Sequence, residues 1–185
     1  MATMFVAACG GEDGPGDIAP SGPRLAVDEG SGAVDGVGIG DDTATIERVF
    51  GEAPPYNIYK NTTPLGVEPV DLTHPGNLGG CRPRGRENAL RYRGVSFFSY
   101  GDRTCDVLVT SERATTRRGL SPGDPIERVE ELYPELECGE TNVASEGTLF
   151  EPACWGRTGE GIYIWIGGDP INNVMFVDGP ITPRQ

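Results

Sequence analysis

The chain has 185 residues, of which 15 are Lys or Arg and 28 are Asp or Glu, so its formal net charge is −13. This charge argues against binding to nucleic acid, because phosphates are bound by positive surfaces. Hydrophobic residues make up 37% of the chain, which is enough for one modest core. No apolar run approaches the roughly 20 residues that a membrane-spanning helix needs.

The N-terminal region contains the motif Val6-Ala7-Ala8-Cys9-Gly10. A branched apolar residue, two small residues and a cysteine resemble the lipobox of bacterial lipoproteins, where the signal peptide is cut before the cysteine and the thiol carries lipid. Residues 1–9 are therefore expected to be the remnant of a lipoprotein signal with a shortened apolar region, and Cys9 is the expected lipidation site. The alternative is a short tail in which Cys9 is a free thiol.

Residues 10–35 follow this cysteine and contain no aromatic side chain. Such a segment buries too little apolar surface to offset the entropy of ordering it, so it is predicted to be a flexible, acidic, Gly- and Pro-rich tether. A tether behind a lipidated cysteine would hold a folded domain away from a membrane. These features predict an extracytoplasmic protein that is anchored to a bacterial membrane by lipid, or secreted if the lipobox is not used.

An internal repeat follows the tether. Residues 36–51 align with residues 119–134, and Gly40-Asp41 matches Gly123-Asp124. In the second copy, Asp124 is the expected N-cap of a short amphipathic helix that Pro134 ends. Each copy is therefore expected to open with a short helix.

A second correspondence follows each predicted helix. Residues 94–110 align with residues 161–177, and both read as strand, Gly-Asp turn and strand, the pattern of a β-hairpin. The predicted fold class is α+β, a tandem repeat of short helices packed on an antiparallel β-sheet or hairpin. The predicted modules are residues 36–118, with a long loop insertion, and residues 119–185.

Four cysteines remain after Cys9 is set aside, and an even number in an exported domain predicts two disulfides. Pairing within each repeat gives Cys138–Cys154 and Cys81–Cys105, and the two other connectivities stay open. Each bridge would contribute about 3 kcal/mol in the chain-entropy model. Because the chain has no C-x-x-C motif and one histidine, no zinc site, redox-active site or cofactor is expected.

The pattern Gly-x-x-x-Gly-Asp before a short amphipathic helix, followed by hairpins, is repeated over about residues 36–178. This arrangement resembles the tandem modules of beta-lactamase inhibitory protein and the single module of the BamE (SmpA/OmlA) outer-membrane assembly lipoproteins. The resemblance implies a two-module fold whose sheets form one concave surface and, as in the inhibitor, one disulfide in each module. It implies no particular target.

Enzymatic chemistry finds little support in the residue pattern. A Ser-His-Asp or Cys-His arrangement would depend on His74 in the irregular insertion. The Gly-rich segment 36–40 precedes Asp41 and Asp42, which would repel a phosphate and are better read as helix caps. The acidic residues of segment 124–131 are expected to be a solvated helix face rather than a metal site. No catalytic residue and no metal ligand is therefore predicted.

Alternation along the hairpin strands separates an aliphatic set from an aromatic set. The aliphatic set is expected to face the core, and its members are Val95, Phe97, Ser99, Ile162, Ile164 and Ile166. The aromatic residues on the opposite face would be protein-interface anchors, unless the other module or the insertion covers them and they are core. These residues are Phe98, Tyr100, Tyr163 and Trp165.

A local basic cluster stands out in this acidic chain. It would bind anionic lipid, an acidic polymer or the carboxylates of a partner, or it is a solvated loop and strand edge. Its members are Arg82, Arg84, Arg86, Arg91 and Arg93.

The leading functional hypothesis is a non-enzymatic, lipid-anchored binding protein that engages an envelope protein of unknown identity through the aromatic face. The alternative is a structural or assembly scaffold of the envelope, in which the anchor matters more than any one surface. A third hypothesis is an enzyme that acts on cell-wall polymer or lipid.

Overall fold

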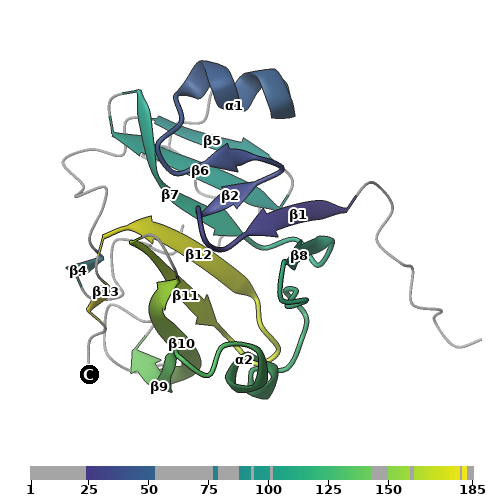
Figure 1. Ribbon diagram of the computed structural model, residues 1–185, viewed down its shortest axis with the longest axis vertical. Helices are drawn as coiled ribbons and strands as arrows, with labels where there is room; N and C mark the ends of the chain where they lie inside the picture. Colours follow the sequence, from purple (N-terminus) through teal and green to yellow (C-terminus); the bar gives the residue numbers. More distant parts are fainter. Residues whose placement is uncertain are drawn as a thin grey trace, which may run out of the picture.

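A computed structural model describes residues 24–52, 77–78, 88–92, 94–100, 102–142, 150–158, 161–179 and 181–182. Within these ranges the chain forms thirteen strands and two helices. The strands make a seven-stranded sheet, a four-stranded sheet and a two-stranded ribbon (Figure 1). The ribbon pairs β4 (Asn77–Leu78) with β13 (Ile181–Thr182).

The seven-stranded sheet is antiparallel throughout and takes strands from both halves of the chain. The two predicted hairpins, β6–β7 and β11–β12, are present and meet at the centre, where β7 pairs with β12. In spatial order the strands are β5 (Asn88–Tyr92), β6 (Val95–Tyr100), β7 (Arg103–Val109), β12 (Asn173–Asp178), β11 (Ile162–Gly167), β10 (Phe150–Thr158) and β9 (Glu137–Asn142).

The four-stranded sheet begins inside the segment that was expected to be a tether. Its order is β3 (Val37–Gly38), β2 (Ala33–Val34), β1 (Leu25–Asp28) and β8 (Ala114–Thr116), with β1 and β8 parallel. The prediction of a flexible tether is therefore wrong for residues 25–35. The Asp35-Gly36 turn joins β2 to β3 with φ angles of 49° and 83°, the positive values that a two-residue type I′ hairpin needs.

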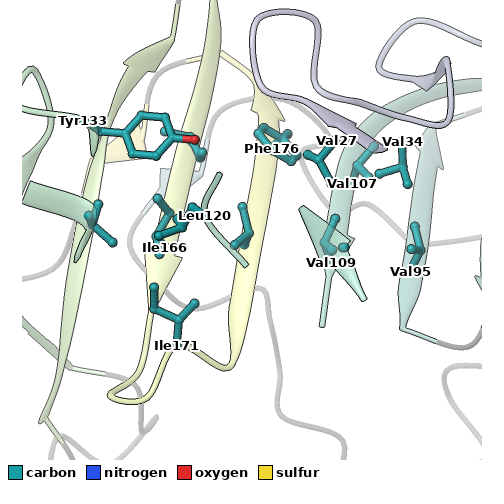
Figure 2. Packing of buried hydrophobic residues seen from close by; sticks show 14 of the residues in the cluster. Val27, Val34, Val95, Val107, Val109, Leu120, Tyr133, Ile166, Ile171 and Phe176 are labelled. Atoms are coloured by element: carbon teal, nitrogen blue, oxygen red, sulfur yellow. The ribbon is translucent and has the colours of Figure 1, made fainter. Parts of the chain in front are cut away.

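The main core lies between the two sheets and the helices. On the seven-stranded sheet, one register row presents Val95, Val109, Val174 and Ile166 to this core, and the neighbouring row presents Phe97, Val107, Phe176 and Ile164. Val27 and Val34 of the four-stranded sheet pack against these rows (Figure 2). The aliphatic set that was predicted to face the core does so.

The helices cover opposite ends of the same sheet face (Figure 1). Helix α1 (Thr43–Phe50) buries Ile46 and places the Phe50 ring 5.1 Å from the ring of Tyr92 on β5. Burial raises the pKa of Tyr92, and the charge of Glu47 adds to the rise. Helix α2 (Glu127–Leu132) buries Val129 at the β9–β10 end.

The predicted α+β tandem repeat of helices packed on sheets is wrong. The described part of the chain is mostly strand, with sheets of four and seven strands and only two helices, of eight and six residues. The physical reason is that the β1–β3 segment, through Val27, Val34 and Val37, takes much of the core-facing area that the helices were expected to cover.

The two aligned segments that precede the helices, at Gly40-Asp41 and Gly123-Asp124, nevertheless have similar local structures. The Asp41 carboxylate accepts a hydrogen bond from the backbone of Gly38 at 2.8 Å, and Asp124 accepts one from Ser121 at 2.9 Å. Each turn then docks on its own hairpin. The Gly40 N–H donates to the Thr104 carbonyl, as the Gly123 N–H donates to that of Ile171.

The two helices begin differently, which corrects the predicted N-cap at Asp124. Asp42 caps α1, and hydrogen bonds from the Thr45 hydroxyl and from its backbone N–H hold the pKa of this carboxyl below its usual value. Helix α2 has Ile126 at its N-cap position and no side-chain cap. The reason is that Pro125 occupies the position of Asp42 and has no side-chain acceptor, while the Asp124 carboxylate is bound to Ser121.

Candidate binding face

The face of the seven-stranded sheet that points away from the main core is the second face. Its central register row is the tryptophan row, with one residue on each of four adjacent strands. Leu108 of β7 is opposite Met175 of β12, Met175 is opposite Trp165 of β11, and Trp165 is opposite Trp155 of β10. The row continues to Glu137 on the edge strand β9.

The tryptophan row is buried at its centre and partly open at both ends. Trp165 and Met175 are 4% and 5% exposed and belong to a second hydrophobic cluster, while Trp155 and Leu108 are half-buried against it. The two indole rings are stacked, with centroids 5.6 Å apart. Stacked aromatic rings add to the stability that their buried area provides.

Two glycines let the tryptophan rings lie close to the strands. A Cβ atom at Gly139 of β9 would lie 3.3 Å from the Trp155 ring, and one at Gly167 of β11 would lie 3.0 Å from Trp165 Nε1. Contacts this short require a neighbour to move. The absence of a side chain at these two glycines therefore leaves room for the tryptophan rings.

The next register row carries charge at one end. Asp106 of β7 lies between Phe98 and Val177 and is buried, and Tyr163 is followed by the exposed Arg157 on β10. The second face thus combines an apolar centre with charged residues at its β10 and β9 margin, Arg157 and Glu137.

The predicted aromatic anchors lie on the second face where the structure describes their side chains, but two of them are not exposed. Phe98 and Trp165 are each 4% exposed and act as core, whereas Tyr163 is half-buried. The side chain of Tyr100 lies outside the described residues. The sequence reasoning missed Trp155, because Pro152 and Gly156 concealed the alternation of β10, in which Ala153, Trp155 and Arg157 share a face.

Of the predicted basic cluster, the structure describes Arg91 alone. Its guanidinium lies 5.9 Å from the centre of the Phe98 ring on the second face, a cation–π distance. Arg82, Arg84, Arg86 and Arg93 lie outside the described residues, so the cluster stays a prediction.

A separate buried polar network surrounds Glu29. Its carboxylate accepts hydrogen bonds from the backbone of Arg117 and Arg118, and the Tyr133 hydroxyl lies 3.2 Å from Glu29 Oε1 and 2.7 Å from Thr116 Oγ1. Burial raises the pKa of Tyr133, and the Glu29 carboxylate adds to the rise. The phenol therefore stays protonated at neutral pH, and the network fastens the end of β1 to α2.

The predicted Cys138–Cys154 disulfide is present and joins directly opposed positions of β9 and β10. Cys105 is also disulfide-bonded, and Cys81, its predicted partner, lies outside the described residues, as do Cys9 and His74. Among the residues that the structure places, no three His, Cys, Asp or Glu side chains gather as metal ligands, and no helix is long and apolar enough to cross a membrane.

Comparison of the chain with protein-family models, with curated proteins and with solved structures finds no match. The resemblance to beta-lactamase inhibitory protein and to the BamE lipoproteins therefore stays a prediction, as do the lipidation of Cys9 and the location of the protein.

Proposed function

We propose that the protein is a lipid-anchored, extracytoplasmic binding protein that engages another envelope protein through the second face. The observation that carries this proposal is the partial exposure of Trp155, Tyr163 and Leu108 around the buried centre of that face. Aromatic residues and methionine are enriched in protein interfaces, and hot spots lie at well-packed centres with a polar rim. Arg157 and Glu137 supply charged groups of the kind that such a rim contains.

The Cys138–Cys154 disulfide supports the proposed compartment. Disulfides persist in oxidising environments and are rare in the bacterial cytosol. Together with the lipobox at Cys9, this bond favours an exported protein that is anchored to a bacterial membrane by lipid.

Capture from solubilised envelope tests the binding face. The full chain, immobilised through a C-terminal tag, is compared with Trp155→Ala and with Val49→Ala. Val49 is the matched control, because it is an exposed apolar residue, 49% accessible, on helix α1. We expect the wild type and Val49→Ala to retain a specific envelope protein. Trp155→Ala should retain at least about tenfold less of that protein.

Circular dichroism and an intact Cys138–Cys154 bond establish that each variant is folded. Equal retention by all three proteins would show that the second face is not the binding surface. Phe98→Ala and Trp165→Ala are unsuitable for this test, because truncating buried rings costs about 3–5 kcal/mol of stability.

Fractionation of cells tests the anchor. We expect the wild-type protein in the membrane fraction and Cys9→Ser in the soluble fraction, because the serine hydroxyl cannot carry the thioether-linked lipid. Metabolic labelling with a fatty acid should mark the wild type only. A Cys9→Ser protein that stays with the membrane would contradict the proposed anchor.

A further inference from the structure

The Cys138–Cys154 disulfide ties β9, the last strand of the seven-stranded sheet among the described residues, to its neighbour β10. β9 pairs with β10 on one side, and the described sheet ends at β9. Cys138 is half-buried at this edge, whereas Cys154 is fully buried in the main core. Of the two residues, Cys138 is therefore the one that is partly open to solvent.

Few side chains of β9 hold it in place besides this bond. Glu137, Gly139 and Glu140 are exposed, and Thr141, whose hydroxyl donates to the Glu151 carbonyl at 3.4 Å, is the buried polar residue of the strand. A strand with this little apolar burial depends on its backbone ladder and on its covalent tie.

β9 also supports one end of the tryptophan row. The Trp155 ring lies over Gly139, and Glu137 is directly opposite Trp155 in the register. Detachment of β9 would uncover the Trp155 ring and the free backbone edge of β10. The disulfide lies on the core side of the sheet, and β9 carries it on one face while contacting Trp155 on the other.

The other described half-cystine is placed differently. Cys105 is 8% exposed and lies on β7, in the interior of the sheet between β6 and β12. Thiol–disulfide exchange needs access of a thiolate to a sulfur atom. Of these two residues, Cys138 is therefore the more open to an attacking thiolate.

We propose that the Cys138–Cys154 bond is a redox-controlled latch, which keeps β9 paired with β10 at the end of the tryptophan row when oxidised and releases β9 when reduced by a dithiol. Its effect on partner binding rests on the proposed function; the release of β9 does not. The latch would make the accessibility of Trp155 depend on the thiol–disulfide balance of the compartment.

The chemistry balances as a dithiol–disulfide exchange. One thiolate of the dithiol attacks Cys138 Sγ, the S–S bond breaks, and Cys154 leaves as a thiolate that takes up a proton. The second thiolate of the dithiol attacks the mixed disulfide and releases Cys138. The dithiol is oxidised by two electrons to its disulfide, and the protein gains two thiols.

Graded reduction of the folded protein with dithiothreitol at pH 8 tests the latch. Thiols are trapped by alkylation and identified by mass spectrometry, and amide hydrogen exchange is read strand by strand. We expect Cys138 and Cys154 to be reduced and alkylated while the rest of the sheet stays folded. We also expect β9 amides to lose protection by about tenfold or more while β11 and β12 keep theirs.

Acrylamide quenching of tryptophan fluorescence reports the second face. Reduction should increase quenching in the wild type and change it much less in Trp155→Phe. A Cys138–Cys154 bond that is reduced only when the whole sheet unfolds, or unchanged protection of β9 after reduction, would overturn the proposal.

A double variant, Cys138→Ser with Cys154→Ala, checks the latch without a reductant. In this variant the amides of β9 should exchange hydrogen rapidly while those of β11 and β12 stay protected. Protection of the β9 amides would overturn the proposal. Capture of the envelope partner is measured separately on oxidised and reduced protein. Release of β9 with equal capture overturns the regulatory role alone, whereas absence of any capture by oxidised and reduced protein overturns the proposed function.

Discussion

Glu29 and Tyr133 show how a few residues hold distant segments together. Glu29 lies in the turn after β1 and is 6% exposed, yet its carboxylate accepts two backbone N–H groups and contacts the Tyr133 hydroxyl. The Glu29 carbonyl also accepts a hydrogen bond from the Thr158 hydroxyl at 2.6 Å. A buried carboxylate is tolerable only when its acceptors are occupied in this way. The network therefore joins β1, α2 and β10.

Removal of one hydroxyl from this network tests its contribution. Tyr133→Phe keeps the ring but leaves Glu29 and Thr116 with one partner fewer, so we expect a loss of about 1–2 kcal/mol in the free energy of unfolding. Urea denaturation measures it, with an unchanged m-value. Tyr163→Phe, on the partly open second face, is the matched control and should change stability by less than about 0.5 kcal/mol. Equal losses in both variants would contradict a special role for Tyr133.

At the level of elements, very short segments become strands when they meet a partner. β2 and β3 have two residues each and are joined by Asp35-Gly36. The Asp35 carboxylate accepts a hydrogen bond from the Ala26 backbone at 2.8 Å, which ties the turn to β1. The edge strand β9 buries little apolar surface, and the Cys138–Cys154 bond holds it to β10 covalently.

At the level of the whole molecule, the central pairing of β7 with β12 makes one sheet from both halves of the chain. Phe176 on β12 is fully buried. Val27 and Val107, from the first half of the chain, lie beside it, so both halves contribute side chains to one core (Figure 2). A core shared in this way should unfold as a unit.

Isolation of one predicted module tests this cooperativity. Residues 119–185 alone would lose β7 and the four-stranded sheet, so Phe176 and Val174 would be left uncovered. We expect the fragment to show no cooperative urea transition by circular dichroism, whereas the full chain unfolds in one transition. A fragment with its own sigmoidal transition would establish an independent domain.

The local patterns predicted well what depends on local contacts. The alternation of apolar residues placed Val95, Phe97, Ile164 and Ile166 toward the core, and the repeat placed Cys138 opposite Cys154. The aligned motifs Gly40-Asp41 and Gly123-Asp124 predicted a short helix after each, and both helices are present, although the N-cap expected at Asp124 is wrong. In each case the deciding interaction lies within one strand, one hairpin or one repeat, so sequence spacing carries it.

The tertiary structure alone decided the fold class and the accessible part of the second face. Val27 and Val34 lie in a Gly- and acid-rich stretch, and they form strands because β8 and the seven-stranded sheet offer hydrogen bonds and apolar area from far along the chain. Whether Trp165 or Trp155 is accessible likewise depends on strand order, which places Trp165 inside the sheet and Trp155 beside its edge. The burial of a side chain depends on neighbours that are distant in sequence, and the spacing of residues along the sequence does not show which neighbours these are.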